Sequence, residues 1–194
     1  MISYSVNEQE FYSLLMMLEN KDPYTACHQR RVARLAVAIA KDLKLNTAHI
    51  DNIYKAALLH DIGKLLIPTR ILNKPSCLNF QELELMKLHP EIGARMLRMR
   101  DYLYPYAEIV LQHHEKIDGS GYPNGLYGGN ILIEARIIGV VDVFDALVFP
   151  RPYRSGCCVK NALEEVTKDV EICYDLDAVN SLGHLLENEP LYLN

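Results

Sequence analysis

Two adjacent histidines, His113-His114, are followed by two carboxylates and by a glycine-punctuated turn that ends in Gly121-Tyr122-Pro123. A second cluster, His60-Asp61, lies upstream and is followed after two residues by Lys64. Imidazole and carboxylate groups together suit iron, manganese, zinc or nickel better than calcium or magnesium alone. Two such ions can hold both oxygens of an in-line phosphoryl displacement. The two clusters therefore indicate the halves of one metal-dependent site for a phosphodiester.

Further ionisable residues lie near expected helix ends and loops, and five of the seven histidines belong to this group. Because neighbours on a helix point about 100° apart, His113 and His114 cannot easily bind one ion in the same way, but they can bind one ion each. The carboxylate of Asp61 can bridge two ions that lie about 4 Å apart. A lone His-Asp or His-His pair carries little information, but both in one chain are specific. The candidate metal ligands are His28, His60, Asp61, His89, His113, His114 and Asp142.

Helical periodicity dominates the segments that must position these residues. Apolar residues recur at three- and four-residue steps over residues 28–43, which predicts one amphipathic helix. Asn79 followed by Glu82 is typical of a capping box that opens another helix. Pro90 would break or kink that helix, or open the next one. Further helices are expected over residues 47–61, 105–114, 133–148 and 160–169, with a short one before residue 189.

Five glycines and a proline between residues 119 and 129 predict an irregular loop. No alternating strand pattern of useful length is present. The sequence therefore predicts an all-α, single-domain helical bundle with a glycine-rich loop at the mouth of the site. We expect one domain over residues 1–194, with an N-terminal helical extension over 1–20, a core over 21–177 and a C-terminal tail over 178–194.

Composition limits the alternatives. The 194 residues are enough for a single core that folds without disulfides, and the five cysteines are irregularly spaced. A formal net charge of −5 argues against a protein that coats DNA or RNA. The most apolar region, residues 131–149, is interrupted by four charged residues, so no membrane span is expected. A cytoplasmic location is the expectation.

These motifs resemble the HD-GYP subgroup of the HD phosphohydrolases. The resemblance covers roughly residues 21–177, and the diagnostic motifs occur in the usual order. Besides the two clusters above, the matching motifs are Asp22-Pro23-Tyr24-Thr25, Ile71-Leu72-Asn73-Lys74-Pro75, Met86-Lys87-Leu88-His89-Pro90, Ala135-Arg136-Ile137, Asp142-Val143-Phe144-Asp145-Ala146-Leu147 and Arg151-Pro152-Tyr153-Arg154.

The resemblance implies a bundle of the HD-domain type that hydrolyses cyclic di-GMP to pGpG and often onward to GMP. It implies the seven metal ligands named above, with Asp61 as the bridge and a hydroxide between the two ions as nucleophile. Lys64 would contact the scissile phosphate, and Gly121 and Tyr122 would line the substrate pocket. Arg151 and Arg154 would hold the second phosphate, because arginine binds phosphate bidentately.

Three departures from the family pattern bear on cofactor and substrate. Tyr24 stands where some members carry a glutamate ligand, so two divalent ions are expected and a third is not. Iron or manganese is favoured over zinc or nickel. Val148-Phe149-Pro150 replaces a usual polar stretch, and Ile117 replaces a frequent aromatic. We expect these last two changes to affect substrate affinity more than metal binding.

Two other functions stay open. One is hydrolysis of another cyclic dinucleotide such as cyclic GMP-AMP. The other is a non-catalytic module that senses the nucleotide or docks onto a diguanylate cyclase or another signalling protein. The intact ligand set favours catalysis over the binding module, because a binding module does not need all seven ligands.

Overall fold

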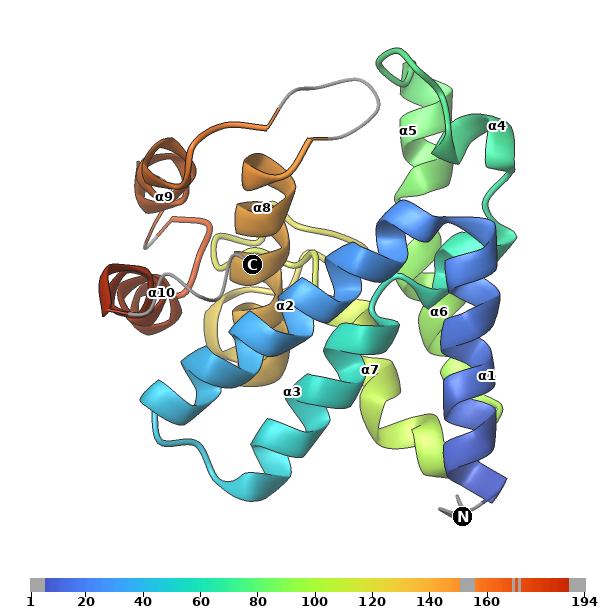
Figure 1. Ribbon diagram of the computed structural model, residues 1–194, viewed down its shortest axis with the longest axis horizontal. Helices are drawn as coiled ribbons and strands as arrows, with labels where there is room; N and C mark the ends of the chain where they lie inside the picture. Colours follow the sequence, from blue (N-terminus) through green and yellow to red (C-terminus); the bar gives the residue numbers. More distant parts are fainter. Residues whose placement is uncertain (1–5, 151–155, 169, 171, 189–194) are drawn as a thin grey trace.

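The computed structural model describes residues 6–150, 156–168, 170 and 172–188, apart from the side chains of residues 23–26. It is all-α, as predicted. No strand is found in this part of the chain, and β-type pairing is limited to two isolated bridges. The helices are α1 Val6–Lys21, α2 Pro23–Asp42, α3 Thr47–Leu59, α4 Thr69–Leu72, α5 Phe80–Met86, α6 His89–Arg98, α7 Tyr104–Gln112, α8 Ile133–Val148, α9 Val159–Lys168 and α10 Leu176–Asn188 (Figure 1).

Helices α2, α3, α7 and α8 surround the centre of the molecule. The predicted stripe of α2 is buried: Val32, Ala36 and Ile39 are fully covered. Helix α3 packs along α2, and α8 packs against both of them. Helices α9 and α10 cover α8 on one side, whereas α1 lies against α2 on the other (Figure 1). The core therefore lies between α2, α3, α7 and α8, and these helices also carry or precede most of the candidate ligands.

Helix ends match the sequence signals closely. Asn79 and Glu82 form the predicted capping box of α5. That helix ends at Met86, and Pro90 lies in the first turn of the next helix, α6, so Pro90 opens a helix and does not kink one. The side chain of Asn46 accepts a hydrogen bond from the His49 amide at the start of α3. Helix α3 ends at Leu59, two residues earlier than expected.

Both ends of the described chain form helices, and the C-terminal helix is longer than the sequence predicts. Helix α1 occupies most of the region expected to add one helix before the core. Helix α10 has 13 residues and packs on α2, α8 and α9, so it is longer than the short helix expected there. It extends through much of the region expected to be a C-terminal tail. Within the described residues, no helix combines the length and apolarity that crossing a membrane requires.

One close backbone contact brings two parts of the site together. Residues 62–66 form a 3₁₀ helix after α3, and it packs against the start of α6. A methyl group on Gly63 would lie 2.0 Å from the carbonyl oxygen of His89 and 2.7 Å from the amide of Gly93. Only glycine allows this approach, which places the His60-Asp61 turn beside His89.

Replacing Gly63 by alanine should therefore destabilise the protein. We expect Gly63→Ala to lower the free energy of unfolding by about 3 kcal/mol or more, because backbone must move to admit the methyl group. Gly129→Ala is the control: a methyl group there has no neighbour within 4 Å, and the expected change is within about 0.5 kcal/mol. Urea unfolding followed by circular dichroism measures both. Equal stability of the two variants would contradict the packing argument.

Candidate metal centre

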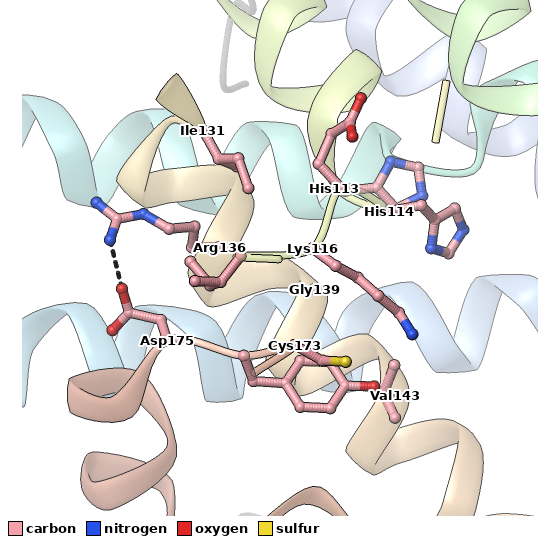
Figure 2. Close-up of a pocket in the computed structure, with 12 residues that line it drawn as sticks. His113, His114, Lys116, Ile131, Arg136, Gly139, Val143, Cys173 and Asp175 are labelled. Atoms are coloured by element: carbon pink, nitrogen blue, oxygen red, sulfur yellow. Dashed lines mark hydrogen bonds and ion pairs between the residues drawn. The ribbon is translucent and has the colours of Figure 1, made fainter. Parts of the chain in front are cut away.

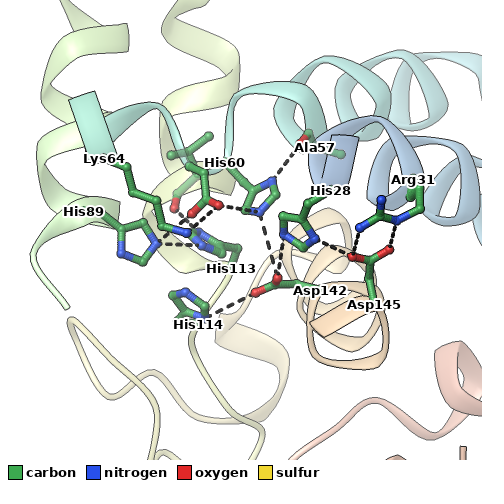
Figure 3. A network of polar contacts seen from close by, with 12 residues as sticks. His28, Arg31, Ala57, His60, Lys64, His89, His113, His114, Asp142 and Asp145 are labelled. Atoms are coloured by element: carbon green, nitrogen blue, oxygen red, sulfur yellow. Dashed lines mark hydrogen bonds and ion pairs between the residues drawn. The ribbon is translucent and has the colours of Figure 1, made fainter. Parts of the chain in front are cut away.

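All seven predicted ligands converge on one point of the fold (Figure 3). They come from five separate regions: α2, the turn after α3, the start of α6, the end of α7 and the middle of α8. Six of them are almost fully buried, and only the His114 side chain, at 22% exposure, reaches the surface. The set comprises His28, His60, Asp61, His89, His113, His114 and Asp142.

Three of the histidines are held in the same way. The Nδ1 atoms of His60, His89 and His113 lie 2.6–2.7 Å from the carbonyl oxygen of the residue three positions earlier. A carbonyl can only accept, so each Nδ1 carries the proton and donates it. These carbonyls belong to the last turns of α3, α5 and α7, where backbone acceptors lack helical partners. Each Nε2 is therefore left as a lone pair that faces the interior.

The inward-facing nitrogen atoms fit a metal ion. Nε2 of His60 is buried and has no hydrogen-bond partner among the described residues. Nε2 of His28 lies 3.0 Å from Oδ1 of Asp142 but without the alignment of a hydrogen bond. The Nε2 atoms of His89 and His113, both lone-pair bearing, face one another at 3.2 Å. Two nitrogens bound to one ion at about 2.1 Å would lie about 3.0–3.4 Å apart, so this spacing suits a shared cation.

The donors form two groups with Asp61 between them. Atoms of His28, His60 and Asp142 lie within 4.8 Å of one another, and so do atoms of His89, His113 and His114. Oδ1 of Asp61 lies 3.4 Å from Nε2 of His89, whereas Oδ2 lies 3.6 Å from Nε2 of His60. One carboxylate oxygen thus faces each group, as a bridging ligand requires.

The adjacent histidines His113 and His114 lie close together beside His89. Both have a donor atom in the group with His89, and their ring centroids are 4.0 Å apart. Donor atoms of His113, His60 and Asp61 also lie within 4.8 Å of one another. The expectation that they serve different ions assumed helical geometry for both. Helix α7 ends at Gln112, and its C-cap His113 still has helical dihedral angles, φ −65° and ψ −13°. That the two histidines bind one ion each stays a prediction, because His113 offers a nitrogen to donors on both sides of Asp61.

Electrostatics prepare the donors for a cation. Burial lowers the pKa of His89 to about 3 and that of His114 to about 4, and it holds the pKa of His113 well below the usual range. Burial alone would raise the pKa of Asp61, but Lys64 and the nearby histidines lower it well below the usual value. Three neutral imidazoles and an ionised carboxylate are the protonation states that metal binding needs.

His28 differs because carboxylates flank both of its nitrogens. Burial lowers the pKa of its imidazole, but Asp142 and Asp145 outweigh burial and raise the pKa to about 9. Oδ2 of Asp145 lies 2.6 Å from Nδ1 of His28. Arg31 in turn donates two hydrogen bonds to Asp145, at 2.6 and 2.9 Å. The Asp145 carboxylate thereby orients His28 with Nε2 directed toward the other donors.

Asp145 is not in the set of site residues predicted from the sequence, although a signal was available. Asp142 and Asp145 are three residues apart on one helix, so both carboxylates lie on the same face. Glu115 is a second residue that the metal-ligand motif does not predict. Its buried carboxylate accepts hydrogen bonds from backbone amides of the glycine-rich loop.

The predicted substrate residues that can be described lie beside the metal centre. Lys64 donates a 2.6 Å hydrogen bond to Oδ2 of Asp61. The ring of Tyr122 lies 4.8 Å from that of His114, and the Lys87 ammonium lies 5.8 Å from the Tyr122 ring centroid. Gly121 packs on Glu115 with no room for a side chain. Arg151 and Arg154 lie outside the described residues.

A second hollow lies next to the metal centre. It is lined by residues of the segment 113–117, by α8 and by the segment 173–175 (Figure 2). Arg136 projects into this region but is ion-paired with Asp175. The hollow is also lined by Lys116 and by the donors His113 and His114, but by none of the donors from α2 or the turn after α3.

Comparisons with known proteins agree with the motifs and the fold. The chain is 41% identical over 152 residues to the cyclic di-GMP phosphodiesterase response regulator RpfG of Xanthomonas campestris. The aligned region covers 77% of this chain and 40% of that protein. It is 43% identical over 155 residues to a cyclic di-GMP phosphodiesterase of Thermotoga maritima, and that alignment covers 79% of this chain and 42% of the relative. It is 36% identical over 174 residues to the 3'3'-cGAMP-specific phosphodiesterase 3 of Vibrio cholerae, and that alignment covers 90% of this chain and 38% of the relative.

Solved structures show the same fold. The HDG"Y"P protein Bd1817 of Bdellovibrio bacteriovorus superposes with a TM-score of 0.68 at 24% identity, covering 82% of this chain and 51% of that one. The chain spans about two fifths of the length of the curated relatives. The family model described as HD domain matches residues 13–177. The chain therefore belongs to the HD domain family, as its HD-GYP motifs indicated.

Proposed function

We propose that this domain is a metal-dependent phosphodiesterase that hydrolyses cyclic di-GMP to pGpG and, if the second bond is also cleaved, to GMP. The observation that carries the proposal is the buried cluster of seven donors with Asp61 between its two groups. The names of the relatives from Xanthomonas campestris and Thermotoga maritima support cyclic di-GMP as the substrate.

Two divalent ions, iron or manganese before zinc or nickel, would fit the cluster. His28, His60 and Asp142 would hold one ion, His89, His113 and His114 the other, and Asp61 would contact both. No third ion is proposed. When bound, the ions would supply Lewis-acid activation of water and of the phosphate.

The surrounding side chains would bind and orient the substrate. Lys64 is 17% exposed and already lies beside Asp61, so its ammonium can neutralise charge that develops on the scissile phosphate. Tyr122 would form one wall of the pocket, because one side of its ring is occupied by His114. Gly121 would contribute through its backbone. Arg151 and Arg154 are proposed for the second phosphate on sequence grounds alone.

Cyclic GMP-AMP is the second candidate substrate, because three related phosphodiesterases of Vibrio cholerae are named as specific for it. No residue in the described part of the site gives a reason to prefer guanine over adenine at the position where the two dinucleotides differ. Docking onto a diguanylate cyclase or another signalling protein stays a prediction.

Product analysis tests the proposal directly. Protein loaded with Mn²⁺, or with Fe²⁺ under anaerobic conditions, should convert cyclic di-GMP to pGpG, as measured by chromatography. Asp61→Ala should lose most of the bound metal and about 10³-fold or more of the activity, since both groups of donors lose their shared ligand. Asp51→Ala, an exposed aspartate on α3, is the control and should change neither. Metal-replete protein that binds the dinucleotide without cleaving it would refute the enzyme and support the sensor.

The orientation of His28 by Asp145 gives a second test. Asp145→Asn should weaken metal affinity about 10–100-fold, because the neutral amide holds the His28 ring less firmly and makes it a poorer donor. Competition with a coloured chelator measures the affinity without any substrate. Asp175→Asn removes another partly buried, arginine-paired carboxylate outside the cluster and should leave the affinity unchanged. A wild-type affinity in Asp145→Asn would show that Asp145 serves the fold alone.

A further inference from the structure

The carboxylate of Glu115 lies inside the glycine-rich loop. The residue is 8% exposed, although glutamate usually remains in water. Oε1 accepts a hydrogen bond from the amide of Asn124 at 2.7 Å, and Oε2 accepts one from the amide of Leu126 at 2.9 Å. Gly125, between them, has φ +64°, a conformation that side chains rarely adopt. This conformation lets both amides reach one carboxylate.

The same short segment carries the metal ligands and supports the loop. Tyr122 donates its amide to the carbonyl oxygen of His114 at 3.2 Å. A methyl group on Gly121 would lie 2.5 Å from Cα of Glu115, so the loop backbone rests directly on this residue. The loop is therefore attached to the His114–Glu115 segment at two places. Backbone contacts hold it at Gly121 and Tyr122, and the Glu115 carboxylate holds it at Asn124 and Leu126.

Nothing else among the described residues explains this buried charge. Glu115 makes no ion pair with a described cationic side chain, and its carboxylate belongs to neither group of metal donors. Two amide donors are the partners seen for its oxygens. A carboxylate is the suitable group here, because each of its oxygens can accept from one amide, whereas a side-chain amide presents only one acceptor.

We propose that Glu115 is a positioning residue that fixes the loop 121–126 and thereby presents Tyr122 to the substrate. It acts on substrate affinity and leaves the metal ions in place. This inference rests on the proposed function. A loop that is ordered before binding does not lose that conformational freedom when the dinucleotide arrives, so loss of the anchor weakens binding more than turnover.

Glu115→Gln tests the proposal, with Glu134→Gln as the matched control. Glu134 is 6% exposed, but its carboxylate is paired with the His49 side chain and not with the loop. In Glu115→Gln, we expect hydrogen exchange of the segment 124–126 to speed up at least tenfold. Metal content should stay at the wild-type value, KM for cyclic di-GMP should rise about tenfold, and kcat should stay within about twofold. Glu134→Gln should show none of these effects.

Either of two results would overturn the proposal: unchanged exchange in the loop, or loss of metal from a folded Glu115→Gln protein. If that variant does not fold, Glu115→Asp keeps the charge but shortens the reach to the two amides, and the same shifts are expected. An inactive wild-type protein would refute the proposed function instead. The exchange measurement would then still decide whether Glu115 anchors the loop.

Discussion

The structure depends on bringing the ends of several helices to one point from which water is largely excluded. Imidazole lone pairs and carboxylates that face one another there cannot all be satisfied by the protein itself. Lys64 beside Asp61 and Arg31 beside Asp145 compensate part of the negative charge. The facing Nε2 atoms of His89 and His113 have no such compensation. Buried polar groups without partners are costly, so this arrangement is best stabilised by bound cations.

Carbonyl groups at helix ends orient three of the histidine rings in this cluster. A helix leaves its last carbonyls without partners, and a histidine placed just beyond the end can donate Nδ1 to one of them. His60, His89 and His113 each use this contact. The contact fixes the ring and its tautomer together, without any further side chain. His28 lies within a helix and has no free carbonyl nearby, so it requires the separate support of Asp145 and Arg31.

Local patterns predicted the helices and the ligand set, but contacts between distant segments were beyond them. The α2 stripe, the capping box at Asn79 and the helix start at Pro90 are short-range signals, and each is confirmed. Helix α1 lacks a strong apolar face, and packing decides its position. The approach of His89 to His113 depends on the packing of α6 against α7. The role of Gly63 depends on His89, which lies 26 residues later, and no periodicity encodes that contact.

The Val148-Phe149-Pro150 stretch also contacts a residue that supports His28. It was expected to act on substrate affinity through Arg151. In the structure, the guanidinium of Arg31 lies 3.7 Å from the centroid of the Phe149 ring. Stacking of this kind restrains an arginine and shields its hydrogen bonds from water. Arg31 holds Asp145, and Asp145 holds His28.

A polar side chain at position 149 could not stack on Arg31 in this way. Phe149 therefore adds a packing contact to the support of His28, and the effect of the stretch on substrate affinity stays a prediction. The chain combines a firmly supported metal centre with a loop anchored by Glu115, and the two supports share no described side chain. The two parts meet at His114 and Glu115, since the His114 ring packs beside Tyr122 and the Glu115 carboxylate holds the loop that follows.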